Sequence, residues 1–359
     1  MDLEGYIIDQ MKKHPSAEPQ DIVKQCYQAA FGVEHLLSDF SRAEKCFEEE
    51  WERTQAADVE PAEKISRDIY RINLASWKYK KLPKEWLFSM FTMSASARED
   101  DKELFEKYLE AVENLINQGK VRIERTAWED YIIRYKASCM EPVRHSDGYR
   151  RAETPAYRIV RKDYARLLPI LEITARELAK KETCIIVIDG RAASGKTTLA
   201  RHLQEVLKAG VVHMDDFFLP LNLRTKERLS VPGGNIHYER FAEEIVPNLR
   251  KKESFSYKIF DCAKMDYSGA RTIEAEEIRI VEGSYSCHPE LDDYGDVRVF
   301  CDISPKEQLR RIIERGGRVK AVEFEEKWIP LEEEYFAAYG IQGKADVEIG
   351  SCEKQVAET

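Results

Sequence analysis

The sequence lacks any uninterrupted apolar run of about 18 residues, the length that a membrane-spanning helix needs. It also lacks an apolar leader, because the first stretch, MDLEGYIIDQMKKHP, carries charges from the second position onward. The eight cysteines form no Cys-x-x-Cys pair, so the spacing of a zinc site is missing. We therefore expect a cytoplasmic protein without a membrane segment, in which cysteines serve as small apolar side chains.

An excess of positive charge is also missing. The 359 residues include 56 Lys and Arg against 66 Asp and Glu, a formal net charge of −10. Because nucleic-acid backbones select basic surfaces, we do not expect nucleic acid as the main partner. One local exception lies within 143–167, where basic residues alternate with tyrosines, and its simplest interpretation is a solvated helix face and loop.

The chain is long enough for two domains, and its apolar pattern divides it into two halves. In the first half, apolar residues recur at three- and four-residue steps, as in 19–54 and in 100–120, which closes with Gly119 as a helix stop. From Cys184 onward, short apolar runs (CIIVID, VVHM, IRIVEG, VRVFCDI) alternate with helical stretches, a pattern typical of a doubly wound parallel sheet. We predict three segments: an all-α domain over 1–165, a linking helix over 166–182 and an α/β domain over 183–359.

The segment GRAASGKT, residues 190–197, matches the phosphate-binding loop of P-loop NTPases. Glycines let the backbone turn so that successive N–H groups face one point, and the following helix adds its positive N-terminal end. In such loops the lysine, here Lys196, reaches the β- and γ-phosphates, and the hydroxyl, here Thr197, binds Mg²⁺. We therefore predict a P-loop NTPase fold that binds ATP and Mg²⁺. The predicted nucleotide contacts are Gly190, Arg191, Ala192, Ala193, Ser194, Gly195, Lys196, Thr197 and Thr198.

Carboxylates follow two later apolar runs of this half. Asp215 comes after VVHM, and Glu282 ends IRIVE. Because ligands bind at the carboxyl ends of parallel strands, we expect both side chains to face the phosphate loop. A carboxylate there can bind Mg²⁺ or accept a proton from an attacking hydroxyl, so we predict that Thr197, Asp215 and Glu282 surround the metal.

Arginines gather after the last apolar run. The helix that carries them has a clean start, because SPKE, residues 304–307, is a capping box with proline at the first helical position. The arginines that follow are Arg310, Arg311, Arg315 and Arg318. The last three share one face of a continuous helix, but Gly316 and Gly317 favour a break. Arginines at a mobile edge suit a lid that closes over phosphates, and the alternative is an ordinary solvated helix.

Six segments of the second half, in their order, resemble the uridine kinase-like branch of P-loop kinases, which is akin to phosphoribulokinase: IDGRAASGKTTLA, HMDDFFLP, PGGNIHYERF, VEGSYSCHPEL, VFCDISPKEQLRRIIERGG and KWIPLEEEYF. The resemblance covers about 184–350. It implies that Asp215 is the general base toward a sugar 5′-hydroxyl. It also implies that Arg310 and Arg315 are lid arginines that contact phosphates and, with Lys196, stabilise the transfer.

The segments that hold the substrate in this family depart from its pattern. Authentic uridine kinases carry Tyr-Asp-Phe and then a base-contacting histidine in a β-hairpin, whereas this chain has Phe260, Asp261 and Cys262 and no histidine there. Asn235 or His237 stands where an acidic sugar ligand is expected. The predicted substrate residues are Asn235, His237, Tyr238, Phe260 and Asp261. We predict transfer from ATP to a hydroxyl of a nucleoside, a sugar or a small alcohol; the alternative is a regulatory or nucleotide-sensing NTPase without an acceptor.

The helical half is assigned to no family of known activity. Glu34 and His35 lie near a predicted helix start, and 141–160 is a polar stretch bounded by prolines. That stretch contains His145, Arg150, Arg151 and Tyr157. Because irregular loops on a helical scaffold often bind ligands, we hypothesise a pocket for an anionic or nucleotide-like group. The alternative is a packing module or a contact between copies in a homo-oligomer.

Overall fold

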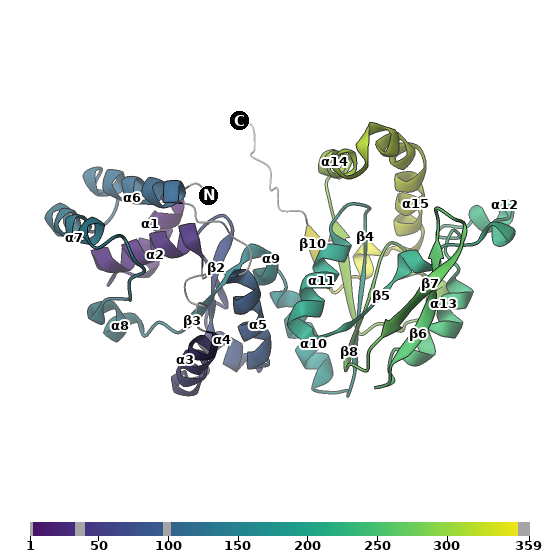
Figure 1. The fold of residues 1–359 in the computed structure, drawn as a ribbon, viewed down its shortest axis with the longest axis horizontal. Coiled ribbons are helices and arrows are strands. Elements are labelled where there is room, and N and C mark those ends of the chain that lie inside the picture. The colour runs from purple at the N-terminus through teal and green to yellow at the C-terminus, as the bar shows by residue number, and fades with distance from the viewer. Residues whose placement is uncertain (1–2, 33–39, 96–101, 351–359) are drawn as a thin grey trace. The chain divides into compact units, whose positions relative to one another are not determined.

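The computed structural model describes residues 3–32, 40–95 and 102–350, and the chain divides into two compact units, Met1–Leu168 and Pro169–Thr359 (Figure 1). We call them the N-terminal unit and the C-terminal unit. Glu34 and His35 lie outside the described residues. Within the described ranges, no helix is long and apolar enough to cross a membrane.

Helices make up most of the described N-terminal unit, as the spacing of its apolar side chains predicts. They are α1 (Leu3–Lys13), α2 (Pro19–Phe31), α3 (Phe40–Arg53), α4 (Leu74–Tyr79), α5 (Lys84–Ala95), α6 (Lys102–Asn117), α7 (Arg125–Ala137), α8 (Asp147–Glu153) and α9 (Lys162–Ala165). The predicted stop after α6 is confirmed, because Gly119 has a φ of 66°, which favours glycine. Ile22 of α2 and Val112 of α6 belong to the buried core of this unit.

The N-terminal unit is not purely α-helical, which corrects the prediction. Its described residues include a three-stranded antiparallel sheet in the order β1-β2-β3. The strands are β1 (Ala62–Lys64), β2 (Ile69–Asn73) and β3 (Tyr157–Arg161). They are short, and β2 (IYRIN) has an arginine at its centre, so the alternation that identifies a strand is weak. Helical periodicity of the neighbouring segments therefore dominates the sequence pattern.

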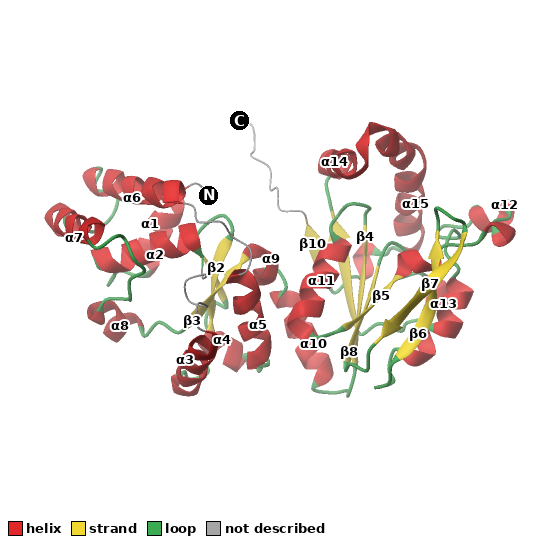
Figure 2. Ribbon diagram, in the orientation of Figure 1, coloured by secondary structure: helices red, strands yellow, loops and turns green. Residues whose placement is uncertain are grey.

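A parallel sheet forms the centre of the C-terminal unit and confirms the predicted doubly wound α/β fold. Among the described residues it has five strands in the order β10-β9-β4-β8-β5, and every neighbouring pair is parallel. The strands are β4 (Cys184–Gly190), β5 (Gly210–His213), β8 (Ile278–Glu282), β9 (Val297–Asp302) and β10 (Val347–Gly350). The first four correspond to the predicted apolar runs, whereas β10 is an addition. Helices lie on both faces of the sheet (Figure 2).

The remaining elements of this unit are helices and one hairpin. The helices are α10 (Leu168–Leu178), α11 (Lys196–Leu207), α12 (Lys226–Leu229), α13 (Tyr238–Glu244), α14 (Pro305–Glu323) and α15 (Ile329–Tyr339). Strands β6 (Phe255–Asp261) and β7 (Asp266–Ile273) pair as the antiparallel hairpin that the resemblance implies, and they stand beside β5 in Figure 1. A helical arch made by α14 and α15 stands at the edge of the sheet where β4 ends.

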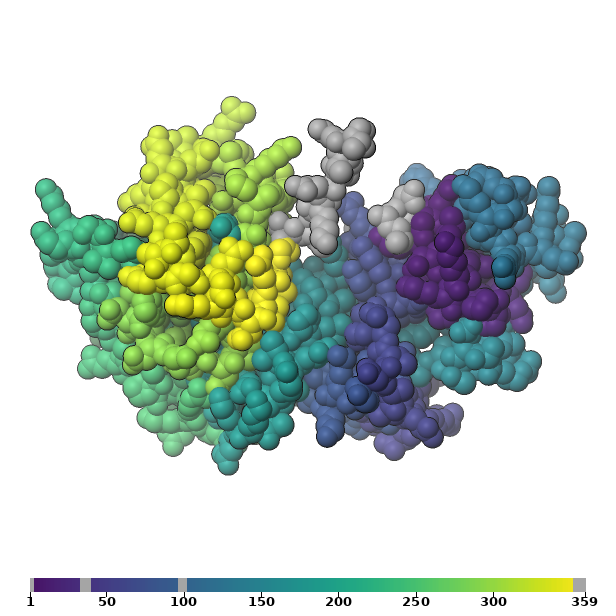
Figure 3. All heavy atoms as spheres, turned by 180° about the vertical axis from the view of Figure 1, so that it is seen from behind, coloured from purple at the N-terminus to yellow at the C-terminus, as the bar shows by residue number. Residues whose placement is uncertain are grey.

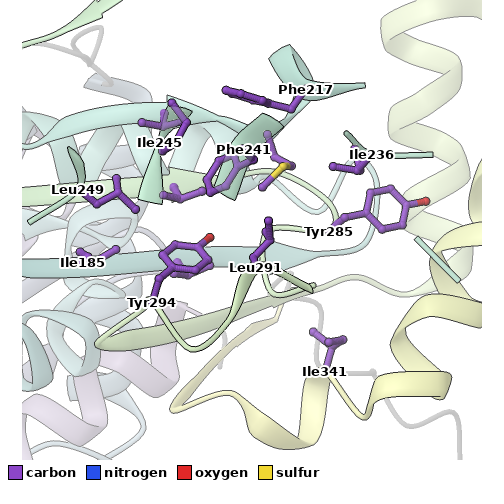
Figure 4. Close-up of a cluster of buried hydrophobic side chains, with 14 of the residues drawn as sticks. Ile185, Phe217, Ile236, Phe241, Ile245, Leu249, Tyr285, Leu291, Tyr294 and Ile341 are labelled. Atoms are coloured by element: carbon purple, nitrogen blue, oxygen red, sulfur yellow. The ribbon is translucent and has the colours of Figure 1, made fainter. Parts of the chain in front are cut away.

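The core of the C-terminal unit surrounds the central strands (Figure 4). Phe217 and Phe241 pack edge to face, with ring centroids 5.0 Å apart. Tyr335 and Phe336 bring α15 into the same core. Figure 3 shows the back of the molecule, where the last described part of the chain is coloured yellow. Every residue of β4 is buried. The phosphate loop therefore begins on a fully buried strand of the sheet.

Candidate functional site

The loop between β4 and α11 has the backbone that its glycines predict. Gly190 has a φ of 136°, and a Cβ atom there would lie 2.1 Å from the carbonyl oxygen of Cys301 on β9. Only glycine fits this position. Gly195 has a φ of 99° and is the N-cap of α11. The positive end of α11 therefore adjoins the loop, an arrangement that favours bound anions.

Lys196 begins α11 and turns back over the loop. Its Nζ donates to the carbonyl oxygens of Gly190 at 2.6 Å and Arg191 at 3.0 Å, and to Ser284 Oγ at 3.1 Å. The hydroxyl of Ser194 is buried without a hydrogen-bond partner in the described part of the chain. The loop thus holds a cation and an unsatisfied donor where the sequence predicts a phosphate.

Glu282, at the end of β8, joins three elements. It is 4% exposed and accepts a hydrogen bond from Thr197 Oγ1 at 3.1 Å. Its other oxygen lies 2.5 Å from Nδ1 of His213, the last residue of β5. The structure therefore brings Thr197 and Glu282 together as predicted. His213 is an addition that the sequence analysis missed, although it stands two positions before Asp215 in the run that ends there.

Asp215 follows β5 in a short 3-10 turn, η2 (Met214–Phe217). Its carboxylate approaches the end of β8, because a Cβ atom on Gly283 would lie 3.5 Å from Asp215 Oδ1. The side chain is open to solvent, but the protein crowded around it raises the pKa of Asp215 by desolvation; Lys196 lowers that pKa and Glu282 raises it. These influences show that Asp215 shares the electrostatic environment of the loop lysine and of Glu282.

Glu332 on α15 is a buried carboxylate that the sequence analysis missed. It accepts hydrogen bonds from the backbone N–H of Ala192 at 2.8 Å and from Ser284 Oγ at 2.6 Å. Burial raises the pKa of Glu332, and the nearby Lys196 opposes that rise. Glu332 therefore connects the arch to the phosphate loop. Its only signal in the sequence is the run LEEEYF, which does not indicate which glutamate faces inward.

Asp189, also missed, fixes the base of the loop. It is completely buried at the end of β4. Its carboxylate accepts hydrogen bonds from the backbone N–H groups of Gly190 (2.7 Å), Tyr285 (3.2 Å) and Cys287 (3.0 Å) and from the hydroxyl of Tyr335 (2.8 Å). The segment after β8 is thereby held against the start of the loop.

Arg191 and Arg311 are the arginines that lie on the loop. Arg191 is a loop residue whose guanidinium pairs with Glu333 at 2.6 Å and with Asp302. Arg311 of α14 donates from Nη1 to the carbonyl oxygen of Ala193 at 3.3 Å. Arg310, expected from the resemblance to contact phosphates, is exposed and pairs with glutamates of its own helix. In this structure Arg311, rather than Arg310, touches the loop.

The second part of α14 changes direction at Gly317. Its φ of 78° and ψ of 174° are not helical, which confirms the predicted break. Half of the predicted capping box is present, because the side chain of Ser304 accepts from the backbone N–H of Glu307 at 3.4 Å, whereas the Glu307 carboxylate pairs with Arg310 and Arg311. Arg315 is exposed just before the break and Arg318 is exposed just after it. The break therefore separates arginines that a continuous helix would place on one face.

Three predicted substrate residues lie just before α13 or at its first position. Asn235 Nδ2 and His237 Nδ1 are buried atoms with no hydrogen-bond partner among the described residues, and the same holds for the hydroxyl of Tyr285. Burial raises the pKa of Tyr285, and Asn235 lies close enough to offset part of that rise. Tyr238 stacks on His288 with ring centroids 5.0 Å apart. The segment thus carries polar groups available to a bound molecule.

The other two predicted substrate residues lie on the hairpin. Phe260 is buried and packs edge to face on Tyr267. Asp261 accepts hydrogen bonds from the backbone N–H groups of Ala263 at 2.9 Å and Lys264 at 3.4 Å, which lower its pKa and hold the turn. Burial raises the pKa of Cys262, and Asp215 adds to that rise. The tip of the hairpin therefore lies within electrostatic range of Asp215.

The oxygen donors of this site fit Mg²⁺. They are Thr197 Oγ1 and the carboxylates of Asp215 and Glu282, and hard oxygen ligands are those that Mg²⁺ prefers. Within the described ranges, no group of three or more His, Cys, Asp or Glu side chains is arranged to hold a metal.

Comparisons with known proteins concern about half of the chain. No protein-family model matches it, and no curated protein matches it. Among solved structures, it is similar to one described as a "Possible Uridine Kinase" from Bacillus stearothermophilus, at 21% identity and a TM-score of 0.38 over 52% of this chain and 99% of that one. It is also similar to a "putative fructose transport system kinase" from Silicibacter sp. TM1040, at 20% identity and a TM-score of 0.39 over 49% of this chain and 98% of that one. Structures with uridine kinase and sugar kinase names are therefore among those that the chain resembles.

Proposed function

We propose that the C-terminal unit is an ATP- and Mg²⁺-dependent phosphotransferase of the uridine kinase-like class. It transfers the γ-phosphoryl group to a hydroxyl of a nucleoside or a similar small acceptor. The observation that carries the proposal is the convergence of Lys196, Thr197, Asp215 and Glu282 at the carboxyl ends of β4, β5 and β8. Lys196 and Thr197 serve phosphate and metal binding in any such loop, and a second carboxylate beside Glu282 can accept the proton of an acceptor hydroxyl.

The roles of these side chains follow from their charges. Asp215 accepts the proton of the acceptor hydroxyl on its carboxylate, which increases the nucleophilicity of the oxygen. Lys196 and the N–H groups of the loop stabilise the negative charge on the transferring phosphoryl group. Thr197 and Glu282, with Asp215, hold Mg²⁺, which neutralises phosphate charge when it is bound. Lid arginines Arg310 and Arg315 add positive charge when the arch closes and excludes water.

The acceptor class is inferred from the segment before α13. Asn235 and His237 present buried polar atoms that have no hydrogen-bond partner among the described residues, and the buried hydroxyl of Tyr285 lies beside Asn235. A ligand that hydrogen-bonds such atoms gains more than an apolar ligand, because it removes the cost of leaving them unsatisfied. Hydroxyl-rich molecules such as the sugar of a nucleoside supply these hydrogen bonds. Tyr238, which is partly exposed, adds aromatic surface on which the rest of the acceptor can pack.

The replacement Asp215→Asn tests the proposed base. The amide has nearly the same shape but cannot take the proton, so we expect phosphotransfer to fall at least about a hundredfold. Binding of ATP, measured by calorimetry, should stay largely intact because the loop is unchanged. The control is Asp292→Asn, a change on the surface of the same unit at an exposed position. Near-normal turnover by the Asp215 variant would rule out its role as base.

A screen of acceptors separates the kinase from an NTPase without an acceptor. The full chain is incubated with ATP and Mg²⁺, and ADP is measured with and without added nucleosides, sugars and small alcohols. A kinase produces ADP in step with a phosphorylated acceptor, which mass spectrometry detects. ADP that forms at the same rate without any acceptor would instead support the regulatory or nucleotide-sensing alternative.

A further inference from the structure

A basic cavity of about 460 Å³ lies in the N-terminal unit, where α2, α3, α8 and β3 contribute to its walls. Its basic lining residues are Lys24, Arg42, Arg144, Arg150 and Arg158. The volume is in the range of sites that enclose a small organic molecule. The described residues that line the cavity all belong to this unit. Its chemistry is independent of the phosphate loop.

The lining carries more positive than negative charge. Among the lining residues that the structure describes, Glu50 is the carboxylate, and it pairs with Arg158. Lys24, Arg144 and Arg150 bring more positive charge to the described lining than this one carboxylate balances. Excess charge of this sign in a partly enclosed site favours a ligand with more than one negative charge. Arginine forks match phosphate oxygens in particular, because they donate two parallel hydrogen bonds.

The pKa of Lys24 shows how burial and neighbouring positive charge act on one of the lining residues. Its Nζ donates to the carbonyl oxygen of Val143 at 3.2 Å. Burial lowers the pKa of Lys24 to about 8, and the charges of Arg71 and Arg150 act in the same direction. An ammonium in such surroundings gains from a nearby anion, since the anion restores the charged form.

The polar wall of the cavity is held rigid by hydrogen bonds. His145 Nδ1 lies 2.8 Å from Asp21 Oδ1, and His145 Nε2 lies 2.7 Å from the hydroxyl of Tyr157. Gln28 Nε2 donates to the same hydroxyl at 3.2 Å. Because burial lowers the pKa of His145, the imidazole is neutral, donates to Asp21 and accepts from Tyr157. A wall fixed in this way preorganises a binding site.

Part of the lining is apolar. Phe91 of α5 and Ile159 of β3 line the cavity, and both are buried beside the basic groups. We propose that the cavity binds a small phosphomonoester with a ring-shaped body. Its phosphate contacts Lys24, Arg144 and Arg150, and its ring packs on Phe91 and Ile159. This inference goes beyond the phosphotransfer proposed for the C-terminal unit and does not rest on it.

The volume of about 460 Å³ suits a small molecule, and the net charge of −10 disfavours a nucleic acid as the occupant. Arg151, which the sequence analysis grouped with Arg150, is exposed and is not among the lining residues. Arg151 therefore offers a matched control for its neighbour.

The test uses the full chain carrying Lys196→Ala, so that the phosphate loop contributes little to binding. Isothermal titration calorimetry measures phenyl phosphate and ribose 5-phosphate as probes, with inorganic phosphate and ribose as comparison arms. We expect at least one phosphomonoester to bind more tightly than inorganic phosphate and ribose. The double replacement Arg144→Gln and Arg150→Gln should weaken that binding roughly tenfold or more, because two charge-assisted contacts are lost.

The control Arg151→Gln should leave the affinity unchanged. All three arginines are exposed, so the variants should keep the thermal unfolding curve of the parent chain. Equal loss in the Arg151 variant, unchanged affinity in the double variant, or equal affinity for inorganic phosphate would each overturn the proposal. So would the absence of binding by both phosphomonoesters at millimolar concentration.

Discussion

Glu332 illustrates how one side chain sets the shape of the phosphate loop. Its carboxylate holds the backbone N–H of Ala192 and the hydroxyl of Ser284. Replacing it by alanine leaves a buried N–H group unsatisfied, so we expect Glu332→Ala to lower the free energy of unfolding by about 1–3 kcal/mol. We also expect the rate of phosphotransfer to fall roughly ten- to hundredfold, because the loop loses its anchor.

Chemical denaturation and an ADP assay measure these two effects. The control is Glu334→Ala on the same helix, whose side chain is exposed. If both glutamate variants behave alike, Glu332 has no special role in the loop.

Glu63 gives the N-terminal unit a stability that depends on pH. Burial alone would raise its pKa, but the hydrogen bond with His14 and the charge of Arg71 lower it to about 2. Because the pKa is lower in the folded state, this stabilisation is present above the ordinary glutamate pKa and is lost as the pH falls toward 2. The pKa of His14 is raised despite the burial of the ring. The contribution of His14 to stability is therefore fully present below the ordinary histidine pKa and is lost as the pH rises through the raised pKa.

The replacement Glu63→Gln should therefore lower the free energy of unfolding most between the ordinary pKa of glutamate and that of histidine. We expect a loss of about 2 kcal/mol in the free energy of unfolding near pH 6 and a much smaller loss near pH 3. Urea denaturation at the two values measures the difference, and Glu60→Gln, at an exposed position, is the control. A loss that does not change between the two pH values would contradict the assignment.

The residues that the sequence did not reveal share one property. Glu332, Asp189 and His213 act through the direction in which their side chains point, which tertiary packing decides. The residues that it did reveal, Lys196 and Thr197, belong to a local motif in which spacing alone fixes the geometry. Asp215 and Glu282 lie between these cases, because the rule that parallel strands end at one edge places them without knowledge of packing.

At the scale of elements, the break in α14 depends on a single glycine. Gly317 has backbone angles that side chains other than glycine rarely adopt, whereas Gly316 does not have a positive φ. We expect Gly317→Ala to lower the free energy of unfolding by about 1–3 kcal/mol or to straighten the helix. Gly316→Ala should have little effect, because its new Cβ meets only the flexible side chain of Lys320.

Denaturation curves and the KM for ATP compare the two variants. Since the break lies between Arg315 and Arg318, the Gly317 variant should also change the KM more than the Gly316 variant. Equal curves and equal KM values would show that the break has no influence on the arch.

Strands of the C-terminal unit were predictable because burial on both faces makes them continuous apolar runs. The N-terminal sheet was not predictable from the sequence. Strand β2 pairs with β3, which lies far away in the sequence, and Arg71 interrupts the apolar pattern of β2. Strand β10 (VEIG) is likewise short and stands at the edge of its sheet. Non-local pairing of short strands is decided by the fold and leaves little trace in local sequence.

At the scale of the molecule, each unit has its own buried core. Val112 belongs to the N-terminal core and Phe241 to the C-terminal core, and both are completely buried. We expect each unit to unfold as its own cooperative transition. Val112→Ala should lower the temperature of one calorimetric transition, and Phe241→Leu should lower that of the other. A single transition that both changes shift equally would contradict this expectation.

The cysteines make both proposed sites observable by chemical labelling. Cys46 is exposed and lines the basic cavity, while Cys262 is exposed at the tip of the hairpin near Asp215. Burial raises the pKa of Cys26 and Cys184 to about 12, so their thiols resist alkylation at neutral pH. A thiol reagent followed by peptide mass spectrometry therefore reports each site by its own rate. A ligand that slows the modification of one of these thiols identifies the site it occupies, without any change to the sequence.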